Sequence, residues 1–295
     1  MKVLITGVAG FIGKHLVNYL SKNGNFNVYG LDRVTLDCED TNNEYIVADL
    51  LDNDLCRKVL SLCGQIDAIV HAASLITADN FNSSLVPCNC QGMLNTIQMA
   101  HLVQCKRFIY LSSIPVIGKP LLHPITEDHP TMPQTTYHAS KLFGEHVLLL
   151  QDNKDLNPII LRLSSPIGKG MNTKTILPTF LDCCKSGRDI TLFGKGTRKQ
   201  NYIDVRDICA AIELALQSDY SGVYNIGGNR TISNYDLAAL CIQLTNSKSS
   251  IIFNGKYNSE DDDNWDISIE KALKELHFEP KHDITNIIQS TLEWL

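Results

Sequence analysis

The stretch Thr6-Gly7-Val8-Ala9-Gly10-Phe11-Ile12-Gly13 decides the fold that the sequence predicts. It follows the apolar run Val3-Leu4-Ile5, which indicates a buried strand, and it opens into residues 12–22, where apolar side chains recur at helical spacing. A strand, a glycine-rich turn and a helix in this order form a phosphate-binding turn, because the free N–H groups and the dipole at a helix start attract anions. The first glycine allows the tight turn, the second lets the backbone approach a pyrophosphate, and the third lets the helix pack closely on the strand.

A second strand, Val28–Asp32, ends in an acid about 20 residues past the glycines, where a carboxylate receives the ribose hydroxyls of a dinucleotide. The sequence therefore predicts dinucleotide binding. A carboxylate accepts a hydrogen bond from a free 2′-hydroxyl but repels a 2′-phosphate, so Asp32 favours NAD over NADP. The neighbouring Arg33 could stack on the adenine or pair with such a phosphate.

Composition supports an ordinary soluble protein. The chain has 295 residues, 44% of them hydrophobic and 20% charged, and its formal net charge of −6 predicts no basic surface for nucleic acid or membranes. The ten cysteines are scattered and form no C-x-x-C pair, so we expect buried free thiols and no metal site. The chain begins with a core strand and has no apolar run near the roughly 20 residues of a membrane span, so a cytoplasmic protein is expected.

Strands alternate with helices up to residue 165, which predicts a parallel sheet covered on both faces. Beyond that point the pattern breaks into loops, short strands and helices. We therefore expect an α/β protein with a doubly wound NAD-binding Rossmann domain over residues 1–165 and a smaller, mixed α/β substrate-binding lobe over residues 166–295. Residues 202–205 precede an apolar helix, so this segment is expected to return to the sheet edge, and part of 202–225 would complete the sheet.

Catalytic chemistry is expected at the carboxyl ends of the strands. Tyr137 and Lys141 lie four residues apart in a predicted helix over residues 136–151, so their side chains share one face. Ser112 and Ser113 end the preceding strand at the same edge. An ammonium group one turn away stabilises a phenolate and lowers its pKa from about 10, which suits Tyr137 to act as a general base. Lys141 could also hold the nicotinamide ribose, and Ser113 would donate a hydrogen bond to the substrate oxygen.

Over nearly its whole length the chain resembles the extended short-chain dehydrogenases/reductases of the NAD-dependent epimerase/dehydratase family. The resemblance rests on the glycine motif, Asp32, Asp49-Leu50, His71-Ala72-Ala73, Asn89, Ser112-Ser113, Tyr137 with Lys141, and Asn225-Ile226-Gly227-Gly228. It implies that Asp49 and Leu50 flank the adenine, that the 71–73 segment runs along the cofactor, and that the turn at 166–168 touches the nicotinamide. It also implies a nucleotide-diphosphate sugar bound between the lobes and a homodimer through helices 88–104 and 135–152.

The cofactor and substrate sets follow from the motifs and the resemblance together. The residues expected to bind NAD are Gly7, Gly10, Phe11, Ile12, Gly13, Asp32, Arg33, Asp49, Leu50, Ala72, Ala73, Ser112, Tyr137, Lys141, Pro166 and Ile167. Those expected to bind substrate are Ser113, Ser165, Arg198 and Gln200. Residues 194–203 resemble the family's diphosphate clamp, but the arginine expected near Gln200 is absent. Arg198, two residues earlier, would lie on the same face of a strand and could replace it.

Departures from the family pattern narrow the reaction. The 4,6-dehydratases carry Thr-Asp-Glu where this chain has Ser113-Ile114-Pro115, and neither Ile114 nor Pro115 can act as the added acid or base that elimination of water requires. The cysteine that follows the serine in GDP-fucose synthases is also replaced by Ile114. Dehydration and C3/C5 epimerisation are therefore disfavoured.

The sequence favours a nucleotide-sugar 4-epimerase, in which Tyr137 takes the 4-hydroxyl proton while hydride moves from C4 to NAD and later returns to the opposite face of the keto-sugar. Two alternatives stay open. One is an NAD(P)H-dependent ketoreductase or dehydrogenase acting on a sugar or another carbonyl compound. The other is a non-catalytic NAD(H)-binding regulator, against which the presence of both Tyr137 and Lys141 argues.

Overall fold

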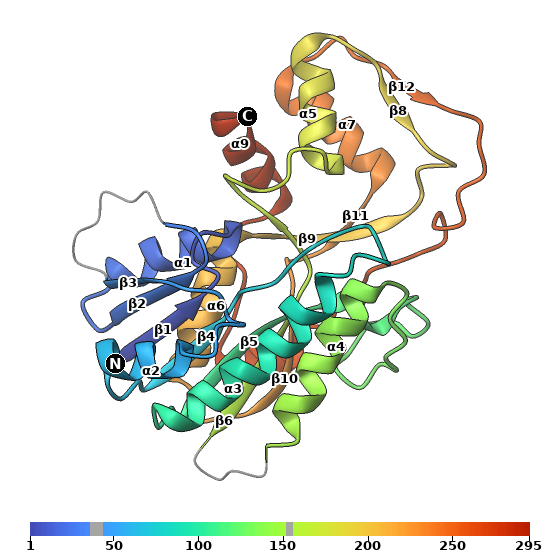
Figure 1. Cartoon of the computed structure of the whole chain (residues 1–295). Coiled ribbons are helices and arrows are strands. Elements are labelled where there is room, and N and C mark those ends of the chain that lie inside the picture. Colours follow the sequence, from blue (N-terminus) through green and yellow to red (C-terminus); the bar gives the residue numbers. More distant parts are fainter. Residues whose placement is uncertain (36–43, 152–155) are drawn as a thin grey trace.

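A seven-stranded parallel sheet forms the centre of the molecule (Figure 1). The computed structural model describes residues 1–35, 44–151 and 156–295. The strands of this sheet are β1 (Lys2–Thr6), β2 (Asn27–Asp32), β3 (Glu44–Val47), β4 (Ala68–His71), β5 (Arg107–Ser113), β6 (Asn157–Leu163) and β10 (Gly222–Ile226). They lie in the order β10-β6-β5-β4-β1-β2-β3, and every neighbouring pair runs parallel. This is the predicted doubly wound arrangement, and its strand order reverses between β1 and β4.

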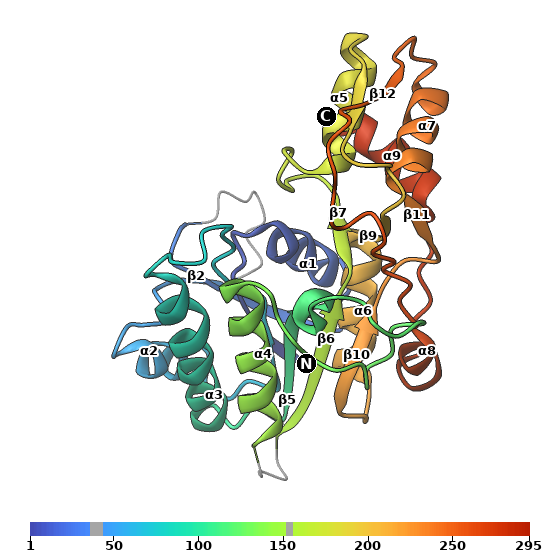
Figure 2. The same ribbon diagram turned by 90° about the vertical axis from the view of Figure 1, so that its right-hand side faces the viewer.

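Helices cover both faces of the sheet (Figure 2). One face carries α2 (Leu55–Cys63), α3 (Gly92–Leu102) and α4 (Thr136–Leu149), and the other carries α1 (Phe11–Ser21), α6 (Val205–Gln217) and the short α8 (Glu270–Leu276). Successive strand residues alternate between the two layers, since Val3 and Ile5 pack with Leu16 of α1 whereas Leu4 packs with Ile97 of α3. This two-sided burial explains the continuous apolar run at the start of the chain.

Two predicted helices differ slightly from the structure at their ends. The helix expected over residues 88–104 begins as a π-helical turn, η1 (Pro87–Gln91), continues as α3 and stops before Gln104, whose φ of 56° is incompatible with a right-handed helix. In α4, Thr135 caps the first turn by accepting a hydrogen bond from the backbone N–H of His138. Residue 152, the expected end of that helix, lies outside the described residues.

A second group of helices and short strands, called the C-terminal part below, lies beside the large sheet (Figures 1 and 2). It contains α5 (Ile176–Ser186), α7 (Asn234–Thr245), α9 (Ile284–Trp294), a three-stranded sheet and a two-stranded sheet. The strands are β7 (Ser165–Ile167), β9 (Lys199–Asp204) and β11 (Thr231–Ser233) in the first, and β8 (Ile190–Leu192) and β12 (Ile251–Phe253) in the second. This part has its own apolar core, which includes Leu181, Leu237 and Ile287.

The expectation that residues 202–205 return to the edge of the large sheet is wrong. Tyr202 and Ile203 belong to β9, which pairs with β7 and β11 in the three-stranded sheet. The chain then crosses back through α6 and adds β10 as the edge strand beside β6. An apolar strand followed by an apolar helix fits either position equally well, and only the pairing partner distinguishes them. The division of the chain at residue 165 stays an interpretation.

The nine cysteines that the structure describes are all free thiols. In the same residues, no group of three or more histidine, cysteine or acidic side chains is placed to hold a metal ion. Of the helices that are described, none is long and apolar enough to cross a membrane.

Candidate active site

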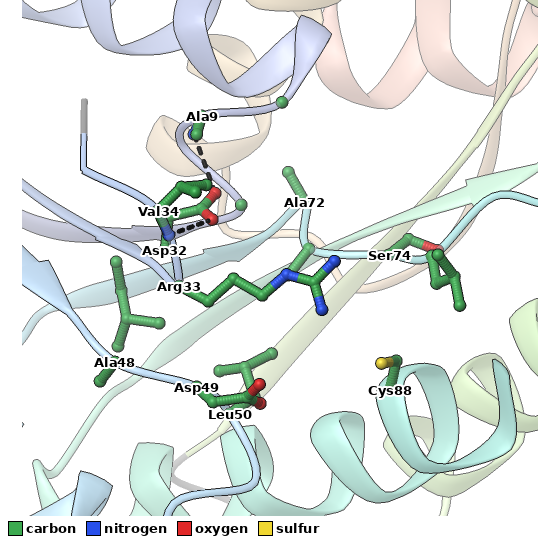
Figure 3. A pocket seen from close by; sticks show the side chains of 15 residues that line it. Ala9, Asp32, Arg33, Val34, Ala48, Asp49, Leu50, Ala72, Ser74 and Cys88 are labelled. Atoms are coloured by element: carbon green, nitrogen blue, oxygen red, sulfur yellow. Dashed lines mark hydrogen bonds between the residues drawn. The ribbon is translucent and has the colours of Figure 1, made fainter. Parts of the chain in front are cut away.

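A cavity of about 310 Å³ opens at the carboxyl ends of β1, β2 and β4, where the strand order reverses (Figure 3). Its lining comes from segments that are far apart in the sequence: Gly7, Ala9, Gly10, Leu31, Asp32, Arg33, Val34, Ala48, Asp49, Leu50, Ala72, Ala73, Ser74, Leu75 and Cys88. The structure thus brings together most of the residues predicted to bind the adenosine and pyrophosphate parts of a dinucleotide. Ser74, Leu75 and Cys88 are lining residues that the sequence did not single out.

The glycine turn forms one wall of this cavity. Gly7 has a φ of 76°, and a Cβ there would lie 2.6 Å from the Cα of Ala73, so any larger residue would push the ends of β1 and β4 apart. A Cβ on Gly13 would lie 2.8 Å from the Cα of Val8, which shows how closely α1 packs on the turn. Gly10 is the N-cap of α1, and no side chain caps that helix start. The result is an open cradle of backbone N–H groups, which suits a pyrophosphate.

Asp32 lies beside the glycine turn, at the end of β2 (Figure 3). Its carboxylate accepts hydrogen bonds from the backbone N–H groups of Ala9 at 2.9 Å and Val34 at 3.2 Å. An ionised carboxylate has about four acceptor positions, so two remain for ribose hydroxyls. The side chain of Arg33 extends across the cavity between the segments that carry Ala72 and Leu50, where it would meet the adenosine part of a dinucleotide.

Asp49 and Leu50 are held in place on the floor of the cavity. The carboxylate of Asp49 accepts a hydrogen bond from the backbone N–H of Leu51 at 2.9 Å, and Asn95 of α3 donates its amide to the carbonyl of Leu50 at 2.7 Å. The role of Asn95 could not be predicted from the sequence, because its partner lies 45 residues away.

Lys141 of α4 is buried, with 4% of its surface exposed. Its Nζ donates a hydrogen bond to the carbonyl of Leu111 at 2.8 Å. The same atom lies 5.1 Å from the centre of the Tyr110 ring and 5.9 Å from that of Tyr137. The predicted sharing of one face by Tyr137 and Lys141 is therefore present, and the ammonium group is bound through a carbonyl and two π faces.

The predicted lowering of the Tyr137 pKa is not seen. Burial raises the pKa of Tyr137 to about 12, an effect that the neighbouring Ser74 hydroxyl partly offsets. Burial also lowers the pKa of Lys141 to about 7, against the charge of Glu145, which raises it. Desolvation therefore outweighs the attraction between phenolate and ammonium in the protein by itself, since both groups are removed from water.

Asn89 connects the cavity to α4, the helix that carries Tyr137 and Lys141. Its side chain accepts a hydrogen bond from the backbone N–H of Leu75 at 2.7 Å and donates to the Leu75 carbonyl at 3.0 Å and to the Ser140 hydroxyl at 2.9 Å. Ser140 in turn donates to the carbonyl of Tyr137 at 2.7 Å. Asn89 lies in the π-helical turn η1, a local deviation that often marks functional sites. This network fixes Ser74 and Tyr137 relative to each other.

The two serines at the end of β5 have different surroundings. Ser112 donates its hydroxyl to the buried carboxylate of Glu145, so its hydroxyl proton is not available to a cofactor or substrate. Ser113 is half-buried at the start of the 3₁₀ turn η2 (Ile114–Ile117), and its side chain does not cap that turn. Ser113 is thus the serine whose hydroxyl fits the predicted role toward the substrate oxygen.

The residues expected near the nicotinamide lie where β7 begins. The ring of Phe11 is next to Gly168, so the start of α1 contacts the turn that follows Pro166. Ile12 packs against the core between α1 and the sheet, and Ile167 is buried in the core of the C-terminal part. Ile12 and Ile167 therefore have only backbone groups to offer a cofactor.

Of the predicted substrate residues, Ser113 ends β5, Ser165 lies on β7, Gln200 lies on β9, and Arg198 directly precedes β9. Ser165 pairs with Tyr202, and Gln200 precedes Tyr202 by two positions on the same strand. Arg198 directly precedes β9 and forms an ion pair with Glu260, while its Nε is buried without a partner among the described residues. The sequence did not predict this ion pair, because the two residues are 62 positions apart.

The segment that carries Glu260 continues to Trp265, which lies near Ser113. Trp265 packs against Ile114, Val116 and Ile117, which directly follow Ser113. Its indole N–H is buried and has no partner in the part of the chain that the structure describes. Arg198 and Glu260 therefore belong to the part of the chain that packs, through Trp265, against the residues following Ser113.

Comparison with known proteins identifies the family. Residues 3–227 match the model of the "NAD dependent epimerase/dehydratase family". The chain belongs to this family. Its members are enzymes and NAD is its cofactor, which confirms the resemblance and the cofactor predicted from the sequence.

Relatives in the family include both epimerases and dehydratases. A putative UDP-glucose 4-epimerase of Methanocaldococcus jannaschii is 27% identical and covers 99% of this chain and 98% of its own length. A dTDP-glucose 4,6-dehydratase of Streptomyces niveus is 26% identical, over 100% of this chain and 92% of its own. The UDP-glucose 4-epimerase of Thermotoga maritima, solved with UDP-glucose, superposes with a TM-score of 0.89 at 22% identity over 100% of this chain and 98% of its own. The last likeness confirms the fold.

The residues present fit NAD. The cradle at Gly7 and Gly13 would be filled by any Cβ, and the start of α1 is free to receive the pyrophosphate. Asp32 offers its remaining acceptor positions to the adenosine ribose. The individual residue roles stay predictions, as does the homodimer through α3 and α4, which lie side by side on one face of the sheet (Figures 1 and 2).

Asp32 generates a prediction about cofactor choice. Apo-protein is expected to bind NAD more tightly than NADP by about tenfold or more, which corresponds to about 1.4 kcal/mol, because the carboxylate repels a 2′-phosphate. Isothermal titration with both nucleotides measures this ratio. Asp32→Ala should reduce the preference for NAD over NADP. Arg33→Ala, which removes the nearby cation, should increase it. Tighter binding of NADP by the unaltered protein would show that Arg33 outweighs Asp32.

Proposed function

We propose that the protein is an NAD-dependent nucleotide-sugar 4-epimerase. The observation that carries the proposal is the composition of the catalytic edge: Tyr137, Lys141 and Ser113 lie there, and the residues that follow Ser113 supply no acid or base. Ile114 is 1% exposed and packs with Val116 and Trp265, and Pro115 has no ionisable group. Such a site can remove and return a proton and a hydride, but nothing in η2 can protonate a departing hydroxyl.

In the proposed reaction, Tyr137, Ser113 and Lys141 have separate roles. Tyr137 takes the proton of the sugar 4-hydroxyl and gives it back after the keto-sugar has turned over. Ser113 donates a hydrogen bond to the same oxygen, which stabilises the charge that develops on it. The charge of Lys141, 5.9 Å from the Tyr137 ring, favours the phenolate. NAD, when bound, accepts the hydride from C4 and supplies it again, so that no net oxidation occurs.

The substrate class is inferred from the relatives and from the C-terminal part. Relatives that cover nearly the whole chain are named for UDP-glucose and dTDP-glucose. A diphosphate needs a cation, and Arg198 is the arginine beside β9 whose Nε is buried and unpaired among the described residues. Glu260 already pairs with Arg198, which would weaken the attraction for a diphosphate.

The reaction can be tested without added cofactor. Purified protein incubated with UDP-, dTDP-, GDP- and CDP-hexoses is expected to form C4 epimers, followed by NMR, with no net change in NADH absorbance. Tyr137→Phe removes one oxygen and should reduce the rate by about 10²–10⁴ while the protein stays folded. Turnover of keto-sugars only with stoichiometric NADH or NADPH would instead identify a ketoreductase. Near-normal activity of Tyr137→Phe would remove Tyr137 from the mechanism.

A second prediction concerns the ion pair between Arg198 and Glu260. Glu260→Gln frees the guanidinium, so UDP and dTDP should bind about twofold to fivefold more tightly, because exposed ion pairs are worth about 0.2–1 kcal/mol. Titration calorimetry measures the change. Asp262→Asn is the matched control, since it removes the same charge from an exposed neighbour that has no ion pair within the described residues. An equal gain in both variants would mean that general charge, and not the release of Arg198, controls binding.

A further inference from the structure

A buried ion pair lies one helical turn after Lys141 along α4. Arg162 of β6 donates to Glu145 of α4 from Nη2 at 2.7 Å and from Nε at 3.1 Å. The two side chains are only 6% and 2% exposed. Glu145 follows Lys141 by four residues, so both side chains share one face of α4. None of the residue roles proposed above uses this pair.

The carboxylate of Glu145 is fixed from several directions. Besides the hydrogen bonds from Arg162, it accepts a hydrogen bond from the hydroxyl of Ser112 on β5. Arg162 is itself oriented by the carbonyl of Glu127, to which Nη1 donates at 3.1 Å. Three side-chain donors, Nε and Nη2 of Arg162 and the hydroxyl of Ser112, therefore converge on this carboxylate and fix its orientation.

The other titratable groups around Lys141 carry no compensating charge. Burial lowers the pKa of His71 on β4 to about 3 and lowers the pKa of His138 on α4. Burial raises the pKa of Tyr110 on β5 and of Tyr137 on α4, so both are neutral at neutral pH. Among the described residues, Glu145 is the one acid whose charge acts to raise the pKa of Lys141.

We propose that Glu145 is a positioning residue that keeps Lys141 protonated, and that Arg162 and Ser112 serve to hold its carboxylate in place behind the lysine. The importance of this charge for catalysis rests on the proposed function, whereas its effect on Lys141 does not. Burial alone drives the lysine toward its neutral form, which could not favour a phenolate at Tyr137. The buried acid opposes that tendency from a position one helical turn after the lysine.

The proposal is tested by titrating Lys141 directly. In protein labelled with ¹³C at lysine Cε, the Lys141 signal is assigned by its loss in Lys141→Met, and its shift is followed against pH in the absence of substrate. Glu145→Gln removes the anion and leaves the Arg162 cation, so the midpoint should move from about 7 to lower pH, by about one pH unit. Because no turnover is measured, a wrong assignment of the reaction would not affect the result.

Two further variants keep the test decisive. Glu145→Gln leaves Arg162 buried without its partner, which destabilises the fold, so the double change Glu145→Gln with Arg162→Gln supplies a neutral, hydrogen-bonding pair. Its Lys141 midpoint should also fall, by a smaller amount. Ser112→Ala removes a hydrogen bond to the same carboxylate but no charge, and its midpoint should stay near that of the unaltered protein. The proposal would be overturned if the Lys141 midpoint of the folded double variant equalled that of the unaltered protein. It would also be overturned if Ser112→Ala lowered the midpoint as far as the double variant does.

Discussion

Burial of the Lys141 ammonium group is the constraint on which the rest of the site depends. Removing a lone cation from water costs several kcal/mol, so the surrounding structure must supply compensating groups. The Leu111 carbonyl, the rings of Tyr110 and Tyr137, and the charge of Glu145 are those groups. They come from β5 and from both directions along α4, which ties α4 to the end of β5.

The cofactor side of the site depends on close backbone approach instead of charge. Gly7 and Gly13 let β1, β4 and α1 meet at distances that no side chain would permit. Asn89 then links the far wall of the cavity to α4 through Leu75 and Ser140. The position of Tyr137 relative to the cavity is therefore set by hydrogen bonds between segments that are adjacent only in the folded chain.

The glycine turn, Asp32 and the spacing of Tyr137 and Lys141 could be predicted from the sequence because each depends on local geometry. The position of β9 could not, since the pattern of residues 202–216 does not show which sheet the strand joins. The pKa of Tyr137 was predicted in the wrong direction because burial is not visible in a spacing of four residues. The partners of Ser112 and Arg198, 33 and 62 positions away, were equally out of reach.

The central claim is that hydride leaves C4 of a nucleotide sugar and returns to C4 in the same site. The most direct measurement uses a UDP-hexose, or the nucleotide-hexose found to react, with deuterium at C4 and no added cofactor. The account predicts a C4 epimer that retains the deuterium at C4, seen by NMR and mass spectrometry. Deuterium found at C6 of a dehydrated product, or absent from C4 of the epimer, would contradict it.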